Sequence, residues 1–225
     1  MKSDRNRALV LEQVRAALGV KGINERRQQT VAERLRRHPR GTIPARAGGN
    51  PEALLQRFAT MLMSQGAEVV HAATPGRAVA AIADALRARD LPAALRVGTD
   101  PSLAALPWDT APAISLRFGK AESGDAAALS RAVAGAAETG TLFLVSGADN
   151  PTTLAFLPEL HVVLIHAEDI VGAYEDAFDR LRKTFGGKLP RSVNMISGPS
   201  RTADIEQTIV RGAHGPKHLL VVILG

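Results

Sequence analysis

The stretch Asn194-Met-Ile-Ser-Gly-Pro-Ser-Arg-Thr-Ala-Asp-Ile-Glu-Gln-Thr-Ile-Val-Arg-Gly-Ala-His-Gly-Pro-Lys-His-Leu-Leu-Val-Val-Ile-Leu224 decides the fold of this chain. Its last six residues, from Leu219 onward, are all apolar, which is typical of a strand that is covered on both faces. Gly198-Pro199 ends the apolar run before it, because proline cannot continue a central strand. The stretch therefore predicts two strands of a buried sheet, joined through a polar segment.

The polar segment between these strands has the pattern of a short helix. Thr202 stands at the expected N-cap, and Asp204 and Glu206 place negative charge in the first turn, where the helix dipole favours it. Gly212 follows as the expected C-cap residue. A helix that begins after a strand in an open α/β sheet presents free N–H groups to an anion. The segment therefore predicts a helix at an anion site.

Two interpretations of these polar residues remain open. Ser200 and Thr202 could simply cap the helix, or they could also line a ligand site. The density of polar groups favours a site, because six lie within eighteen residues: Ser197, Ser200, Thr202, Asp204, Glu206 and His214. Our candidate ligand-binding residues in this segment are Gly198, Ser200, Arg201 and Thr202.

His214 and Asp204 are the candidate catalytic residues. An imidazole in the Gly-rich loop at His214 could act as an acid, a base or a hydrogen-bond donor near neutral pH. It could equally bond a local carbonyl. Asp204 is free to point toward the loop, whereas Glu206 is two positions away and faces another side of the helix. The two carboxylates are therefore not a paired acid and base.

The same stretch closely resembles a known family. Gly198-Pro-Ser-Arg-Thr-Ala-Asp-Ile-Glu206, followed by His214-Gly-Pro216, resembles the C-terminal signature of the lactate utilization protein C family, which carries a LUD domain. The resemblance implies a role in bacterial L-lactate oxidation. It also implies a fold similar to that of ribose-5-phosphate isomerase, glucosamine-6-phosphate deaminase and coenzyme A transferases.

A second segment, Ala137-Glu-Thr-Gly-Thr141, resembles the same family. As a bare tetrapeptide, Glu138 to Thr141 reads better as a turn, with Gly140 as a C-cap. The resemblance makes Thr139, Gly140 and Thr141 candidate ligand-binding residues. Together with Ser146 after the next strand, they are expected to face the loop at 198–202, with His214 near the rim. Phe156-Leu-Pro158 also matches the family, and its apolar residues indicate a structural role.

Composition excludes several classes of protein. The 225 residues suffice for one α/β domain with an appendage, and the absence of cysteine excludes disulfides, a thiolate nucleophile and an iron–sulfur cluster held by this chain. His161 and His166 have no neighbours at metal-ligand spacing, so no metal is predicted. Dinucleotide and P-loop fingerprints are missing, so no cofactor is predicted. The N-terminus lacks the apolar core of a signal peptide, and we expect a cytoplasmic protein without a membrane span.

The basic charge is concentrated at the N-terminus. Residues 1–50 contain 12 Lys or Arg and 4 Asp or Glu, whereas the remainder contains 16 and 18. Periodic apolar residues predict helices over about 4–18 and 24–38, and a linker over 40–50. This arm could contact nucleic acid or an acidic partner, or pack on the body or on a partner subunit. It lacks aromatic residues that stack on bases, which disfavours nucleic acid. We expect a basic helical arm and linker at 1–50 and an α/β domain at 51–225.

The body alternates between the two kinds of element. We expect helices over 51–65, 75–89, 125–137 and 170–185, a turn or short helix over 101–106, and strands over 67–71, 93–97, 113–118, 141–145, 160–165, 192–196 and 219–224. Such alternation indicates βαβ units. The sequence therefore predicts an α/β fold with a largely parallel sheet of about seven strands, helices on both faces and an N-terminal helical arm.

Two functional hypotheses follow. The resemblance implies a cluster-free subunit or accessory protein of a bacterial L-lactate oxidation system, whose iron–sulfur companion proteins carry the redox centres. It would bind a small anion through a helix N-terminus and Arg201. The alternative is a free-standing enzyme acting on a phosphorylated or acyl-coenzyme A small molecule.

Overall fold

The computed structural model describes residues 2–19, 24–205 and 208–225, and the side chains of residues 2–4 and 202–211 are outside the description. The chain divides into two compact units, Met1–Thr42 and Ile43–Gly225. Within the described residues, no helix is both long and apolar enough to cross a membrane.

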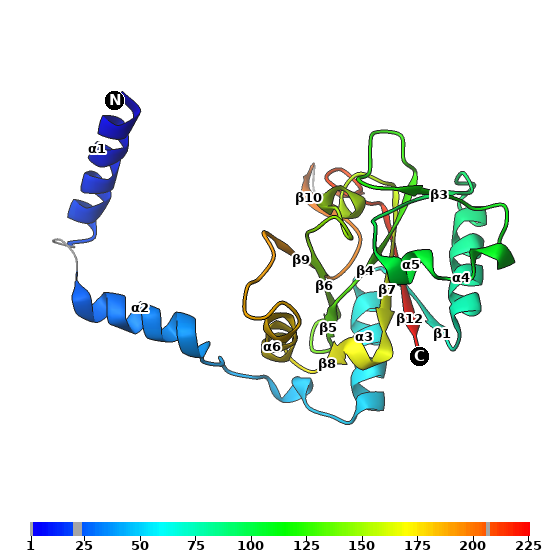
Figure 1. The fold of residues 1–225 in the computed structure, drawn as a ribbon, viewed down its shortest axis with the longest axis horizontal. Helices are drawn as coiled ribbons and strands as arrows, with labels where there is room; N and C mark the ends of the chain where they lie inside the picture. The colour runs from blue at the N-terminus through cyan, green and yellow to red at the C-terminus, as the bar shows by residue number, and fades with distance from the viewer. Residues whose placement is uncertain (1, 20–23, 206–207) are drawn as a thin grey trace. The chain divides into compact units, whose positions relative to one another are not determined.

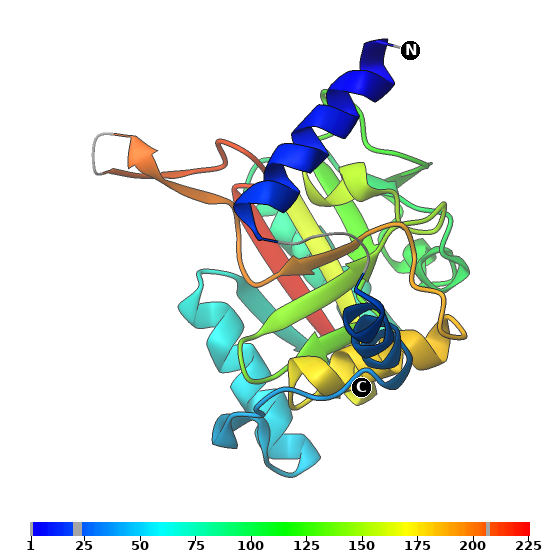
Figure 2. The same cartoon turned by 90° about the vertical axis from the view of Figure 1, so that its left-hand side faces the viewer.

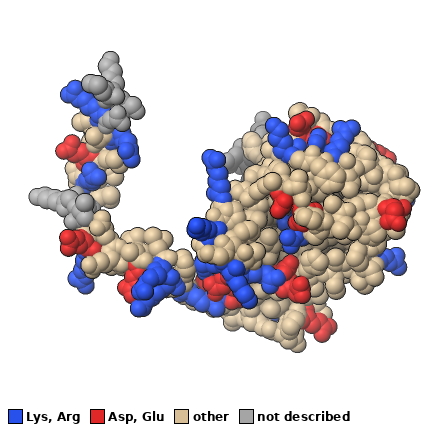
Figure 3. All heavy atoms as spheres, in the orientation of Figure 1, with Lys and Arg blue, Asp and Glu red and all other residues tan. Residues whose placement is uncertain are grey.

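The first unit consists of two helices, α1 (Lys2–Ala17) and α2 (Glu25–Arg37), as the periodicity predicts (Figure 1). Asn24 caps α2 by accepting a hydrogen bond from the backbone N–H of Arg27, and His38 ends it in the left-handed conformation. Every side chain described over 5–19 and 24–42 is exposed. Lys and Arg side chains are prominent along both helices (Figure 3). The unit therefore has no core of its own among these residues.

The second unit is built on a six-stranded parallel sheet (Figure 1). Its strands, in spatial order, are β1 (Glu68–Ala72), β12 (His218–Leu224), β7 (Leu160–His166), β4 (Ala127–Arg131), β2 (Ala94–Val97) and β3 (Ser115–Phe118). The apolar run at 219–224 lies between β1 and β7, as expected for a strand covered on both faces.

Helices cover both faces of this sheet. On one face, α4 (Pro75–Arg87) packs Val79 and Ile82 against alternate strand residues such as Val162 and Leu220. On the other face, α3 (Pro51–Ser64) packs Phe58 and Leu62 against the intervening residues, including Val163 and Val221. The short helix α5 (Pro101–Ala104) follows β2. Four 3₁₀ turns complete the connections: η1 (Ala45–Ala47), η2 (Trp108–Thr110), η3 (Thr152–Ala155) and η4 (Ala167–Asp169).

A second, four-stranded sheet lies on the α3 face. Its order is β8 (Ile170–Val171), β5 (Ala134–Ala136), β6 (Thr141–Val145) and β9 (Val193–Ile196). One side of β6 contributes Leu142 and Leu144 to the core shared with the main sheet, and the opposite side packs Phe143 against the helix α6 (Tyr174–Thr184). The layers of the second unit are thus, in order, α4, the main sheet, a layer that contains α3 and the second sheet, and α6.

The seven expected strands are all present, but they belong to two different sheets. Five of the expected strands belong to the main sheet, while those at 141–145 and 192–196 form part of the second sheet. The expected helix over 125–137 is wrong, because this segment forms β4 and β5. Ala127 to Leu129 are almost fully buried, and their small side chains fit between the layers of the sheet. The helix expected over 170–185 begins later, at Tyr174, after β8.

The helix expected over 202–211 is also wrong. The backbone forms an antiparallel pair, β10 (Arg201–Ile205) and β11 (Thr208–Arg211), in which Thr202 pairs with Val210. Several residues here are β-branched, and such side chains favour strands over helices. The hairpin projects from the body in Figure 2. The anion site expected at a helix N-terminus therefore has no helix behind it.

Candidate functional site

A pocket of about 290 Å³ lies at the amino ends of β7 and β12. His161 and Leu219 are each the second residue of their strand, are paired across the sheet, and line its base. The walls come from the end of β9, the loops around it and the turn before β7. The complete lining is Ala155, Phe156, His161, Met195, Ile196, Ser197, Gly198, Pro199, Ser200, Arg201, His214, Gly215, Pro216 and Leu219.

The two halves of the C-terminal signature are joined by hydrogen bonds that shape this pocket. The backbone N–H of Ser200 donates to the carbonyl oxygen of Pro216 at 2.9 Å, and that of Gly212 donates to the carbonyl oxygen of Ser200 at 3.0 Å. A Cβ atom at Gly215 would lie 3.2 Å from the Cβ of Ser200, so the loops approach closely. The two parts of the signature therefore meet in space, although the β10–β11 hairpin lies between Ser200 and Gly212 in the chain.

The charges that line the pocket favour an anion. Arg201 and His214 are the ionisable side chains at its walls, and both are exposed. Among the residues that the structure describes, no carboxylate lines the pocket. Phe156 and Met195 form an apolar wall, and their side chains are about half exposed, at 44% and 53%. The pocket thus combines a guanidinium and an imidazole with an apolar surface.

His161 is buried beneath the pocket in a neutral environment. It is 1% exposed, and its Nε2 lies 3.0 Å from the Oγ of Ser130. Burial lowers the pKa of His161 from 6.5 to about 3, because the charged imidazolium would lose its hydration. The ring is therefore neutral at physiological pH. The ring can donate or accept a hydrogen bond at the base of the pocket, but it carries no charge there.

A cluster of four hydroxyl groups reaches the pocket through Ser197. The Oγ1 atom of Thr141 is 2.7 Å from Thr139 Oγ1, 2.6 Å from Tyr174 OH and 2.7 Å from Ser197 Oγ. Thr141 itself is completely buried, and of the four residues only Ser197 lines the pocket. Thr139 and Thr141 therefore contact the pocket indirectly, behind Ser197.

The neighbouring residues of the same segment hold this cluster in place. Glu138 is buried, and its Oε1 accepts a hydrogen bond of 2.8 Å from the backbone N–H of Tyr174, the first residue of α6. Gly140 has φ +64°, and a Cβ there would lie 2.6 Å from the backbone nitrogen of Leu62 at the end of α3. Glycine is needed at this position both for the backbone conformation and for the close approach. Gly140 is thus a packing residue of the turn and does not line the pocket.

The structure brings together only some of the predicted site residues. Gly198, Ser200, Arg201 and His214 line one pocket. Ser146 follows the opposite end of β6 from Thr141, where its Oγ accepts a hydrogen bond from the backbone N–H of Ser192, and it is not a lining residue. The side chains of Thr202 and Asp204 lie outside the described part of the structure.

Sequence reasoning missed four lining residues that matter chemically: His161, Ser197, Phe156 and Met195. Ser197 was visible as part of the polar density of the loop. His161 gave a weaker signal, namely a histidine inside an otherwise apolar strand. Phe156 belongs to a segment that was interpreted as structural, and its exposure at the pocket wall adds a second role.

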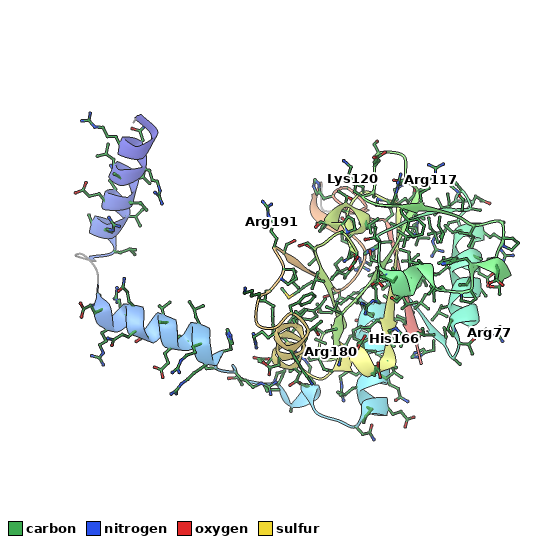
Figure 4. All side chains as sticks on the ribbon, viewed as in Figure 1. Arg77, Arg117, Lys120, His166, Arg180 and Arg191 are labelled. Atoms are coloured by element: carbon green, nitrogen blue, oxygen red, sulfur yellow. The ribbon has the colours of Figure 1, made fainter. Side chains whose placement is uncertain are left out.

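The carboxyl ends of the main strands hold a different set of charges. Asp100, after β2, accepts a hydrogen bond of 2.7 Å from Nε of Arg131 at the end of β4, and Asp169 pairs with Arg180 of α6. Burial raises the pKa of Asp169, and the neighbouring Arg180 and His166 offset only part of that effect. His166 and Arg180 appear together in Figure 4, away from β9 and β10. These carboxylates are already paired with arginines, so the pocket at the amino ends is the better candidate for a ligand site.

These features define an α/β protein with a six-stranded parallel sheet, a second sheet on one face and a pocket that is lined by both parts of its C-terminal signature. The profile of the LUD domain family matches residues 55–224. The chain belongs to the LUD domain family.

Individual relatives agree with this assignment. An uncharacterized protein of Neisseria meningitidis serogroup B is 38% identical over 98 residues, which cover 44% of this chain and 42% of the relative. Lactate utilization protein C of Bacillus subtilis is 37% identical over 82 residues, covering 36% of this chain and 34% of the relative. The aligned part thus spans about two fifths or less of these curated relatives. The crystal structure of a DUF162 family protein from Deinococcus radiodurans has the same fold, with a TM-score of 0.58 at 20% identity, covering 79% of this chain and all of that chain.

Proposed function

We propose that this protein binds a small carboxylate, with L-lactate as the first candidate, as a cluster-free subunit or accessory protein of a bacterial L-lactate oxidation system. One observation carries the proposal: Arg201 and His214 line a pocket that, among the described residues, has no carboxylate. Arginine binds carboxylates through a planar pair of N–H donors. The names of curated relatives such as lactate utilization protein C of Bacillus subtilis support lactate as the candidate.

The proposed role requires partners. Oxidation of lactate removes two electrons, and this chain has no cysteine with which to hold an iron–sulfur cluster. Iron–sulfur companion proteins would therefore supply the electron acceptors, while this chain supplies the anion pocket. We place its work in the cytoplasm, where such companions would also act.

A thermal-shift titration of the full chain tests the binding step. A ligand at about 100 times its Kd stabilises the native state by about 2.7 kcal/mol, which raises the Tm by several degrees. We expect L-lactate or pyruvate to raise the Tm, and we expect Arg201→Gln to abolish the rise. Arg191→Gln is the matched control, because Arg191 is exposed and lies outside the pocket lining (Figure 4).

The proposed biological role needs a separate test. Deletion of the gene should abolish growth on L-lactate, and the wild-type chain but not Arg201→Gln should restore it. Normal growth of the deletion strain on L-lactate, together with no binding of L-lactate or pyruvate, would refute the proposal.

A second candidate function is favoured by the size and the apolar wall of the pocket. A volume of about 290 Å³ is close to the lower limit of drug-sized ligand sites, about 300 Å³, and exceeds the needs of a three-carbon acid. Phe156 and Met195 could contact the body of a larger phosphorylated or acyl-coenzyme A compound. A Tm rise with sugar phosphates or coenzyme A esters, absent with lactate and pyruvate, would favour a free-standing enzyme.

A further inference from the structure

The hydroxyl cluster behind the pocket converges on one oxygen atom, the Oγ1 of Thr141. Thr141 Oγ1 lies 2.6–2.7 Å from three other hydroxyl oxygens, those of Thr139, Tyr174 and Ser197. In each such contact one hydroxyl donates and the other accepts, and a threonine hydroxyl has a single proton. Thr141 can therefore donate to only one neighbour, and it must accept from the other two.

The chemistry of the neighbours favours one direction for the chain. A phenol is a stronger proton donor than an alkyl hydroxyl, so Tyr174 favours donating to Thr141. If Thr139 also donates to Thr141, then Thr141 donates to Ser197. The proton of Ser197 is then free to point into the pocket. Each donor in such a chain polarises the next, which strengthens the last hydrogen bond.

The positions of both ends of the chain are set by packing. Tyr174 is the first residue of α6, its backbone N–H donates to Glu138, and its ring packs edge-to-face on Phe143 with the centroids 5.5 Å apart. Ser197 directly follows β9, whose Ile196 pairs with Leu142 of β6. The two hydroxyls are therefore held on either side of Thr141 by separate elements.

We infer that Ser197 is a ligand-binding residue that donates a hydrogen bond to an oxyanion in the pocket, and that Thr141 and Tyr174 are positioning residues that act through it. This inference rests on the proposed function, because an ionised carboxylate group only accepts hydrogen bonds and therefore requires donors. The ligand class is a small carboxylate, held by the guanidinium of Arg201 on one side and by the hydroxyl of Ser197 on another.

The single tyrosine of the chain makes this inference measurable. Because Tyr174 is the only tyrosine, the tyrosine bands in an ultraviolet resonance Raman spectrum report the hydrogen bonding of one known hydroxyl. We expect titration of the full chain with L-lactate or pyruvate to shift these bands toward a stronger donor state. A purely structural role of Tyr174 would leave the bands unchanged.

Affinity measurements by titration calorimetry test the order of the chain. We expect Ser197→Ala and Thr141→Val each to weaken binding about tenfold, and Tyr174→Phe about threefold. The double variant Thr141→Val/Ser197→Ala should bind no more weakly than Ser197→Ala alone, because the effects of residues that act through one another are not additive. Thr141→Ser keeps the hydroxyl and should restore binding, which guards against a folding defect in Thr141→Val. Ser146→Ala is the control serine, since Ser146 bonds Ser192 outside the pocket.

The outcomes separate this inference from the proposed function. If the anion binds in an Arg201-dependent way, but Thr141→Val retains full affinity and the tyrosine bands do not respond, the inference is wrong and the proposed function stands. If neither L-lactate nor pyruvate binds the wild-type chain, the inference is wrong and the binding step of the proposed function fails with it, while the growth test of the deletion strain still decides the biological role. Weakening by Ser197→Ala and Thr141→Val with rescue by Thr141→Ser supports both.

Discussion

At the scale of single residues, the role of a side chain in the pocket depends on whether it is exposed to the pocket or buried behind it. Ser197 and Thr141 carry the same functional group, yet only Ser197 lines the pocket. The sequence predicted Thr141 as a direct ligand residue because its segment matches the family, but a motif does not reveal which side of a strand faces a cavity. Arg201, by contrast, is the first residue of β10 and His214 lies in the segment after β11, and both line the pocket walls.

Burial of His161 makes stability depend on pH. Below pH 6.5 the unfolded chain binds a proton at this histidine. In the folded chain the pKa of His161 is about 3, so the folded chain binds this proton only near pH 3 and below. The stabilising contribution is therefore complete above pH 6.5 and is lost as the pH falls, by about 1.4 kcal/mol per pH unit. We expect the free energy of unfolding, measured with urea, to decline accordingly between pH 6.5 and 4.

The variant His161→Gln isolates this effect, because glutamine can still bond Ser130 but cannot titrate. Its unfolding free energy should be flatter over the same range. Asp100 adds to this loss of unfolding free energy only near the ordinary aspartate pKa of 3.8 and below. Burial raises the pKa of Asp100, but hydrogen bonds from Ser102 and Arg131 outweigh burial, so the net pKa is lowered. Parallel curves for the variant and the wild type would show that another group controls the decline.

At the scale of elements, the long helices and the buried strands were predictable, whereas the alanine-rich and β-branched segments were not. Alanine is the best helix former, which suggested a helix over 125–137. A surface helix needs a polar face, however, and residues 126–137 contain only Arg131 as a charged residue. That near-absence of charge was the signal for buried strands β4 and β5. Over 202–211, the acidic residues of the expected first turn led to the prediction of a helix. The structure has a hairpin there, as the β-branched residues of the segment favour.

The helix α6 gives an element-scale prediction. Its first N–H group donates to the buried carboxylate of Glu138, which comes from a distant segment. Glu138→Ala leaves that N–H without this acceptor, and we expect a loss of about 1–3 kcal/mol in the free energy of unfolding by urea. The matched control is Glu52→Ala, an exposed glutamate in the first turn of α3, where only about 0.3–1 kcal/mol is at stake. Equal losses would contradict a special role for Glu138.

At the scale of the molecule, the two units differ in how they are stabilised. The core clusters all lie within 47–225, whereas every described side chain over 5–19 and 24–42 is exposed. The boundary at residue 50 stays a prediction from the sequence. In the structure the second compact unit begins at Ile43, and Nε of Arg46 donates to the carbonyl oxygen of Glu138 at 3.0 Å. A change of composition indicates a linker, yet it does not reveal a single long-range contact.

We therefore propose that residues 43–225 fold without the first unit. Because 1 kcal/mol changes the Tm of a domain of this size by about 2–4 °C, we expect the truncated chain to melt cooperatively within about 3 °C of the full chain. Circular dichroism on heating provides the measurement. Loss of a cooperative transition on removal of residues 1–42 would show that the first unit contributes to the core.

The strand order also determines when the sheet can form during synthesis. In the part of the chain that the structure describes, β1 is joined to the sheet only through β12, and Glu68 pairs with Leu220, about 150 residues later in the chain. While the ribosome is still adding residues 73–217, β1 has no neighbour to pair with, and one edge of the apolar surface stays uncovered. Contacts between such distant residues make folding slow. The six-stranded sheet can thus be completed only after the 218–224 segment has emerged from the ribosome.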